Sequence, residues 1–178
     1  NYPSGEPSKI APRQVLKNII GQLSDENLRA VVAPELEFYL CEQNLDPDLP
    51  LKTPIGKSGR RETGSRVFGI DAVNEFDKLT DDIYDYCELM NIGVDTLVHE
   101  SGPSQIEINL NHGDPLALAD QAFMFKRAVR QVALKHNIHA TFMAKPYQGQ
   151  PGSSMHINQN LVSAKTGKNL FSDEEGNN

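Results

Sequence analysis

The chain has 178 residues, and its 17 Lys and Arg against 24 Asp and Glu give a formal net charge of −7. Hydrophobic residues make up 38% of the sequence, which with the glycines is close to the composition of a globular domain. This excludes a disordered or collagen-like chain, and no apolar run approaches the roughly 18 residues of a membrane span. The negative charge argues against nucleic acid as the main partner and fits cationic ligands or metal ions.

Cysteine usage and the chain ends give two further expectations. Cys41 and Cys87 are too few for a disulfide framework, so we expect a reducing, cytoplasmic location with no membrane partner and no secretory signal. The sequence begins with Asn1 and ends in a polar stretch, residues 172–178. We therefore expect a piece of a longer protein.

The first part of the chain predicts a helix, a strand and a long loop. The helix starts near Pro12, since proline is favoured at the first helical position. Its apolar face is formed by Val15, Leu16, Ile19, Ile20 and Leu23. Residues 31–41 alternate between apolar and polar types, which indicates a strand. Residues 42–66 lack periodicity and contain Gly, Pro and basic residues, which predicts a loop.

The middle of the chain predicts a helix followed by a hairpin. Asp71 is expected to cap the helix and Gly93 to follow its end. The apolar positions of this helix recur every 3–4 residues: Phe76, Leu79, Ile83, Tyr86 and Met90. Residues 94–100 and 105–111 are expected to pair as two strands around a four-residue turn.

The last part of the chain predicts a helix and two strands. Asp114 followed by Pro115 is a helix-start signal. The buried positions of this helix are expected to be Leu118, Ala122, Phe125, Val129 and Val132. Residues 139–145 and 154–162 are expected to be strands. The whole order indicates an α+β fold, with a mostly antiparallel sheet and helices packed on one face.

Carboxylates from separate strands are expected on one face of this sheet. Glu35 and Glu37 alternate with apolar residues. The four-residue turn places residue 100 opposite residue 105, so Glu100, Gln105 and Glu107 share a face. Glu100 and Glu107 are then diagonal neighbours about 7–8 Å apart.

The last strand adds an imidazole to the same face. Alternation places Met155 and Ile157 on the packed side and His156 on the polar side, together with Asn158 and Asn160. Crowded carboxylates repel each other unless cations neutralise them. Oxygen ligands with one imidazole suit Mg²⁺ or Mn²⁺ rather than structural zinc. The alternative is an ordinary solvated sheet face.

Four separated stretches occur in the order found in the glutamine synthetase superfamily, which this chain resembles over nearly its whole length. They are Val31–Phe38 (VVAPELEF), His99–Ile108 (HESGPSQIEI), Ala140–Pro146 (ATFMAKP) and Gly152–His156 (GSSMH). Residues 70–76 and 107–109 are similar to the γ-glutamylpolyamine (γ-glutamylputrescine) synthetase branch.

The resemblance implies a ligase that joins the γ-carboxylate of glutamate to an amine, either ammonia or a polyamine. The reaction uses ATP, passes through a γ-glutamyl phosphate and needs two divalent cations, Mg²⁺ or Mn²⁺. By resemblance, Glu37, Glu100 and Glu107 hold one cation. Glu35 and His156 hold the other, with a further Glu expected beyond residue 178. Glu100 and Glu107 are also the expected catalytic residues.

The resemblance also assigns substrate positions. Gly152 is expected where the backbone approaches the substrate glutamate, since a side chain there would intrude. Asp95 is expected to contact the nucleotide, as are Asn158 and Asn160. The last two depart from the family pattern His-x-His-x-Ser, and Asn cannot carry the charge of an imidazolium. A catalytically silent member that acts by binding or assembly is therefore an alternative, and a metal-dependent hydrolase is a weaker one.

The resemblance further implies that residues 1–178 are part of a catalytic domain. The family's N-terminal β-grasp domain and the C-terminal half of its catalytic domain are absent from this chain. The full-length protein is expected to be a ring-shaped homo-oligomer with active sites between neighbouring subunits. We expect the 178-residue chain alone to be inactive.

Overall fold

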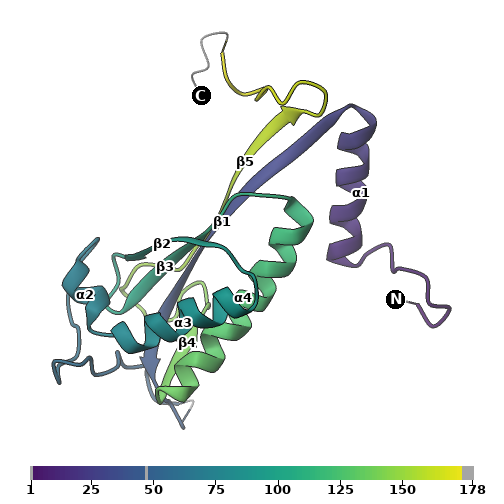
Figure 1. The fold of residues 1–178 in the computed structure, drawn as a ribbon. Coiled ribbons are helices and arrows are strands. Elements are labelled where there is room, and N and C mark those ends of the chain that lie inside the picture. Colours follow the sequence, from purple (N-terminus) through teal and green to yellow (C-terminus); the bar gives the residue numbers. More distant parts are fainter. Residues whose placement is uncertain (1, 47, 174–178) are drawn as a thin grey trace. The chain divides into compact units, whose positions relative to one another are not determined.

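The computed structural model describes residues 2–46 and 48–173, and its centre is a five-stranded sheet (Figure 1). Four strands lie in the order β2-β3-β1-β4, and β5 also pairs with β1. The β1–β3, β1–β4 and β2–β3 pairs are antiparallel. The elements are α1 (Pro12–Asp25), β1 (Leu28–Glu42), α2 (Ile70–Asn74), α3 (Asp77–Leu89), β2 (Val94–His99), β3 (Gln105–Leu110), α4 (Pro115–Lys135), β4 (Ile138–Thr141) and β5 (Met155–Ser163).

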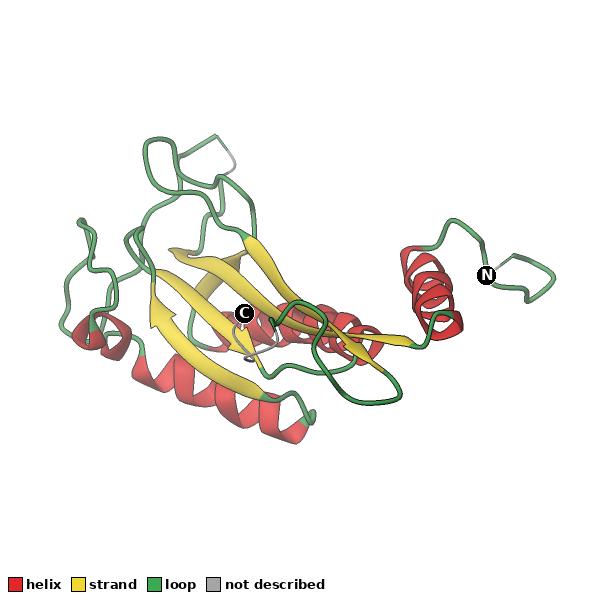
Figure 2. Cartoon of the chain, turned by 90° about the horizontal axis from the view of Figure 1, so that it is seen from above, coloured by secondary structure: helices red, strands yellow, loops and turns green. Residues whose placement is uncertain are grey.

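The helices α3 and α4 lie along one face of the sheet, which confirms the predicted α+β class (Figure 2). The core between them is apolar and closely packed. Its strand residues, all at most 2% exposed, are Leu36, Phe38, Leu40, Ile106, Ile108 and Leu110. From the helices come Leu79, Ile83, Phe125, Val129 and Val132.

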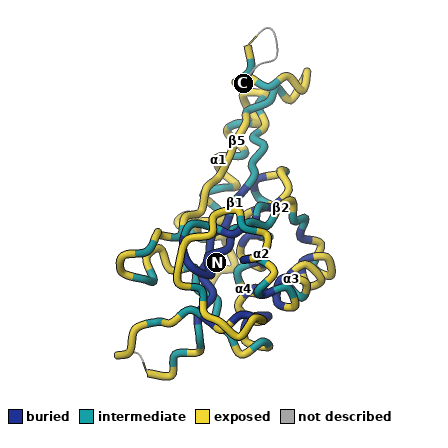
Figure 3. Tube along the Cα trace, turned by 90° about the vertical axis from the view of Figure 1, so that its left-hand side faces the viewer, coloured by how far each residue is buried: buried dark blue, intermediate teal, exposed yellow. Residues whose placement is uncertain are grey.

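The described chain divides into two compact units. One consists of residues 34–111 and 122–156, and it contains most of the sheet and most of the buried positions (Figure 3). The other lies within residues 2–33, 112–121 and 157–173. In that second unit, Arg13 of α1 forms an ion pair with Asp120 of α4 at 2.9 Å.

Several predicted local signals are confirmed. The helix α1 begins at Pro12. The Asp114 carboxylate accepts the N–H groups of Leu116 and Ala117 at 3.0 and 2.9 Å, which caps α4 as expected. The five predicted core positions of α4 are all buried. The hairpin also forms with the expected register, because Glu100 N–H donates to the Gln105 carbonyl at 2.9 Å.

The single helix expected from Asp71 is wrong, because the chain breaks at Glu75 and Phe76 into α2 and α3. Gly69, not Asp71, is the cap residue of α2. At the break, Glu75 binds the preceding loop: its carbonyl accepts from Lys57 N–H at 3.0 Å and its carboxylate accepts from Ser58 N–H at 3.0 Å. Because the loop is bonded to Glu75, the helix predicted from the apolar pattern is interrupted there and forms two helices.

The end of α3 and its apolar face also differ from expectation. Asn91, with φ of 59°, takes the left-handed position after the helix that was assigned to Gly93. Gly93 instead faces Asn111, whose side chain would lie 2.6 Å from an added Cβ. Thr80 and Cys87 are buried on α3, whereas Tyr86 is exposed.

The structure also differs from the predicted apolar faces of α1 and β5 and from the predicted end of β4. No residue of α1 is buried. Met155 and Ile157 of β5 are 44% and 55% exposed. The strand β4 ends at Thr141 instead of Lys145. Periodicity identifies an apolar face but does not say which surface covers it.

Two further observations bear on the sequence expectations. Cys41 and Cys87 are both free and buried, and burial raises the pKa of each thiol to about 11. Within residues 2–46 and 48–173, no helix has the length and apolar character needed to cross a bilayer.

The hairpin turn requires glycine at position 102. A Cβ there would lie 1.9 Å from Tyr39 Oη and 2.5 Å from Cζ of the same ring. Tyr39 is fully buried, and its hydroxyl donates to the Pro151 carbonyl at 2.8 Å, so the ring cannot move aside. We expect Gly102→Ala to lower the free energy of unfolding by about 1–3 kcal/mol, as overpacking of a core does.

Urea unfolding of the purified chain measures this effect. Gly64→Ala is the matched control, because an added Cβ meets no atom within 4 Å there. Equal unfolding midpoints for the two variants would contradict the packing argument.

Candidate functional site

The register of β1 against β3 places the predicted carboxylates on one face. Glu37 lies directly opposite Glu107, and Glu35 lies opposite Asn109. Because opposed residues of an antiparallel pair point to the same side, Glu35, Glu37 and Glu107 share a face. Glu100, opposite Gln105 at the start of the turn, is on that face as well. This is the face opposite to the apolar residues that α3 and α4 cover.

Glu35, Glu107 and His156 bring their ligand atoms together. His156 Nδ1 lies 3.2 Å from Glu35 Oε2. One carboxylate oxygen each from Glu35 and Glu107 and a ring nitrogen of His156 lie within 4.8 Å of one another. Glu35 and Glu107 are partly buried, whereas His156 is exposed. Two hard oxygen donors and an imidazole are a donor set that Mg²⁺ or Mn²⁺ accepts.

Glu37 is the most buried of the four carboxylates. It is 8% exposed, and its Oε2 accepts from Gln105 Nε2 and from Ser154 N–H, both at 3.0 Å. Gln105 is 1% exposed and uses its whole amide: Nε2 also donates to the Gly152 carbonyl at 2.9 Å, and Oε1 accepts from Gly102 N–H at 2.9 Å. Gln105 therefore joins the turn, β1 and the segment before β5.

Glu107 shows the electrostatic strain of this face. Its pKa is raised above the ordinary glutamate value, first by burial and then by the negative charges of Glu100, Glu35 and Glu37. The same crowding acts on Tyr39, whose pKa rises to about 12 through burial and the charges of Glu37 and Glu100. The other three carboxylates thus act on Glu107, and a bound cation would relieve the repulsion among all four.

Gly152 lies next to the site and is tightly packed. An added Cβ would come 2.8 Å from the Ala144 carbonyl oxygen, which already accepts the N–H of Ser153 at 2.9 Å. The backbone alone therefore requires glycine at this position. Its carbonyl is bound to Gln105, so the segment before β5 is fixed to the carboxylate face.

The predicted nucleotide residues, Asp95, Asn158 and Asn160, are all exposed. Asp95 is exposed and sits at a β-bulge, because the register of β2 against β3 shifts between Val94 and Thr96. Asn158 and Asn160 are exposed residues of β5, and the Asn160 side-chain oxygen accepts from Asn169 Nδ2 at 3.3 Å.

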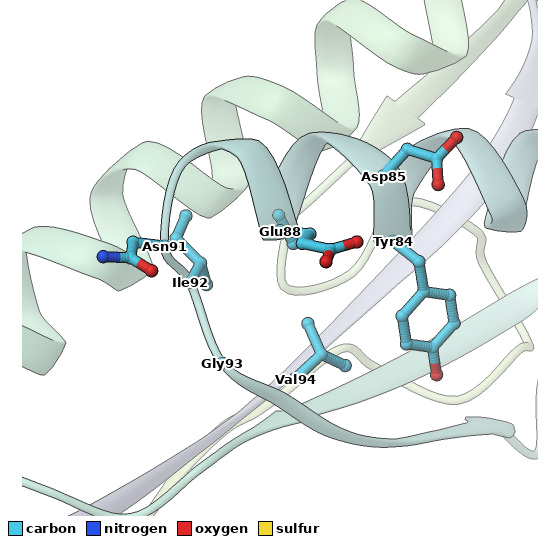
Figure 4. Close-up of a pocket in the computed structure, with 8 residues that line it drawn as sticks. Tyr84, Asp85, Glu88, Asn91, Ile92, Gly93 and Val94 are labelled. Atoms are coloured by element: carbon cyan, nitrogen blue, oxygen red, sulfur yellow. The ribbon is translucent and has the colours of Figure 1, made fainter.

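A separate cavity of about 430 Å³ opens between the end of α3 and the start of β2 (Figure 4). None of the predicted site residues lines it, although Asp95 follows it directly along the chain. Its lining residues are Tyr84, Asp85, Cys87, Glu88, Asn91, Ile92, Gly93 and Val94.

The sequence did not reveal three buried side chains next to the site, which are those of Tyr39, His99 and Glu62. Tyr39 lies on the carboxylate face, opposite Gln105, and is fully buried against Gly102 of the turn. His99 is 1% exposed, and its Nε2 lies 2.8 Å from Glu62 Oε2. Glu62 comes from the loop without periodicity. The one feature of the sequence that marks it is its position among basic residues, between Arg61 and Arg66.

Comparison with known proteins gives consistent matches. Residues 9–178 match the family described as glutamine synthetase, catalytic domain. The chain is 42% identical over 174 residues to γ-glutamylputrescine synthetase PuuA of Escherichia coli K12, covering 97% of this chain and 37% of that protein. It is 34% identical over 175 residues to glutamine synthetase of Pyrococcus abyssi, covering 98% and 37%. The chain thus spans about 37% of the length of these relatives.

Solved structures agree on the fold. The structure described as apo GmaS without ligand has a TM-score of 0.80 and 27% identity, covering 98% of this chain and 40% of that one. Plasmodium falciparum glutamine synthetase has a TM-score of 0.79 at 24% identity, covering 97% and 38%, and shows likeness of fold alone.

Charge crowding at Glu107 predicts a pH-dependent effect of Glu107→Gln in the metal-free chain. The folded-state pKa of Glu107 lies above its unfolded value of about 4.3. Its ionisation therefore costs stability, a loss that develops as pH rises from that value through the folded-state pKa. We expect the variant to be more stable than the parent at pH 7, with the difference vanishing below about pH 4.

Thermal unfolding in EDTA across this pH range measures the difference. Asp81→Asn removes an exposed charge of the same sign from α3 and serves as the control. A destabilised Glu107→Gln variant at pH 7 would show that the carboxylate is not under repulsion.

Proposed function

Because this chain belongs to the glutamine synthetase catalytic-domain family, as its motifs predicted, we propose that it supplies part of the active site of an ATP-dependent ligase. The reaction joins the γ-carboxylate of glutamate to an amine through a γ-glutamyl phosphate. The observation that carries the proposal is the convergence of Glu35, Glu107 and His156 within 4.8 Å on a sheet face that also bears Glu37 and Glu100.

The donor chemistry of this face fits divalent cations. Glu35, Glu107 and His156 would hold one, and Glu37 and Glu100, together with Glu107, would hold a second. Bound Mg²⁺ or Mn²⁺ supplies charge neutralisation for the phosphate oxygens of ATP and of the acyl phosphate. The chain's own contribution is to fix the carboxylates in place: Glu37 through Gln105 and Ser154, and Glu107 through its position between β1 and β2.

The amine acceptor in this proposal is an alkyl diamine or polyamine. The support is the 42% identity to a γ-glutamylputrescine synthetase, against 34% to the glutamine synthetase of P. abyssi. Ammonia is the alternative acceptor, and a direct comparison of the two amines decides between them.

The rest of the active site comes, in this proposal, from outside the chain. Because the chain spans about 37% of its relatives, residues 1–178 form a partial catalytic domain. The missing nucleotide ligands and the further metal-binding Glu would lie in other segments or in a neighbouring subunit of a ring-shaped homo-oligomer. On this view the 178-residue chain binds cations but does not turn over, and the full-length protein acts in the cytoplasm.

Metal binding by the chain tests the carboxylate face directly. At a Mn²⁺ concentration about 100 times its dissociation constant, binding stabilises the folded state by about 2.7 kcal/mol. For a domain of this size that raises the melting temperature by about 5–10 °C. We expect this shift in the parent and in Asp81→Asn, a smaller shift in Glu35→Gln, and its loss in Glu107→Gln, which removes a ligand of both cations. Equal shifts in all four proteins would place the metal elsewhere.

A second candidate is a catalytically silent member of the family. The observation that favours it is the pair Asn158 and Asn160, which stand where the family pattern has His and Ser. Neutral amides donate hydrogen bonds to phosphate but add no positive charge.

An assay of the full-length protein separates the candidates. With ATP, Mg²⁺ and glutamate, the ligase releases phosphate only when an amine is present, and we expect putrescine to serve better than ammonium. A silent member releases none until Asn158→His and Asn160→Ser are introduced together. Phosphate release without any amine would instead indicate a hydrolase.

A further inference from the structure

We propose that Glu62 is a positioning residue for Glu100, acting from the opposite face of the sheet. This inference rests on the proposed function, in which Glu100 is a metal ligand, and adds a residue that the carboxylate face itself does not include. Glu62 lies in the loop between β1 and α2, and its side chain is only 9% exposed.

The Glu62 carboxylate binds both ends of the hairpin turn. Its Oε2 accepts from Ser104 N–H at 2.6 Å, just before β3, and lies 2.8 Å from Nε2 of His99, the last residue of β2. The His99 ring is 1% exposed, and its Nδ1 lies 2.7 Å from the carbonyl oxygen of Glu100. One carboxylate therefore fixes residues 99, 100 and 104 through two direct contacts and one relayed contact.

The strand register shows on which side this contact is made. His99 lies opposite Ile106, and Ile106 lies opposite Phe38, so all three point to the apolar face that the helices cover. Glu100 follows His99 and points to the carboxylate face. Glu62 thus holds the backbone of Glu100 from behind, without competing for a metal ligand position.

The turn needs such an anchor because of its backbone conformation. Ser104 has φ of 58°, a left-handed conformation that is strained for a non-glycine residue. Its N–H is bound by Glu62, and its carbonyl accepts from Leu40 N–H at 2.9 Å. The loop itself is tied to the same strand, since Phe68 N–H donates to the His99 carbonyl at 2.9 Å.

The second oxygen of Glu62 makes no hydrogen bond, so the contacts of the carboxylate are concentrated on Oε2. Its Oε1 is buried without a hydrogen bond, and the nearest cation, Arg66 Nε, lies at 3.9 Å. A buried carboxylate that leaves one oxygen unsatisfied persists only if the other oxygen's contacts are strong. Here those contacts are the turn and His99.

Hydrogen exchange of backbone amides tests the anchor in the 178-residue chain. We expect Glu62→Ala to speed exchange of the Glu100 and Ser104 amides at least tenfold, while β1 and the rest of β3 keep parent rates. Glu62→Gln retains an oxygen acceptor for Ser104 N–H and should stay within threefold of the parent. Glu75→Gln is the matched control, because Glu75 binds the same loop at Ser58 but does not touch the turn.

Mn²⁺ titration of the same proteins tests the consequence for the site. We expect Glu62→Ala to weaken Mn²⁺ binding at least tenfold, as Glu100→Gln does, with Glu62→Gln and Glu75→Gln close to the parent. Unchanged turn exchange in Glu62→Ala, or exchange that speeds up equally throughout the sheet, would overturn the proposal. So would parent-like Mn²⁺ affinity in Glu62→Ala when Glu100→Gln has lost it.

The two measurements test the proposed metal site and the proposed role of Glu62 independently. If the parent does not bind Mn²⁺, the proposed metal site fails, and the exchange data alone decide whether Glu62 positions the turn. If the parent binds Mn²⁺ but turn exchange does not respond to Glu62→Ala, the metal site stands and the role of Glu62 is rejected.

Discussion

Repulsion among carboxylates on one sheet face is the constraint on which the rest of this structure depends. Glu37 lies directly opposite Glu107, and Glu35 and Glu100 are close enough to raise the Glu107 pKa. A fold can keep such a face only if the backbone is held firmly against the repulsion. The packed apolar face beneath it, covered by α3 and α4, supplies that support.

Neutral and backbone groups do much of the positioning around this charge. Gln105 is buried between Glu37 and the Gly152 carbonyl and satisfies its own oxygen at the turn. Because an amide both donates and accepts, one side chain connects three segments without adding charge. Ser154 N–H provides the second donor to Glu37, which ties the segment before β5 to the site through the backbone.

The sequence predicted the parts of the fold and site that depend on local pattern. Alternation placed Glu35, Glu37 and Glu107 on one face, and the four-residue turn gave the register of Glu100 correctly. Patterns could not predict what depends on contacts between distant segments. The break at Glu75 follows from its bonds to the loop at residues 57 and 58, and Glu62 meets His99 across 37 positions of the chain. The assignment of metal ligands and nucleotide contacts to individual residues stays a prediction.

The tethers of the loop between β1 and α2 limit how its length can vary. Glu62 and Phe68 are both bonded to the same hairpin, so the short span between them is closed at each end. Residues 43–46 and 48–52 carry no such double attachment to the hairpin. Relatives that differ in the size of this loop should therefore gain or lose residues before position 53, where extra chain costs little.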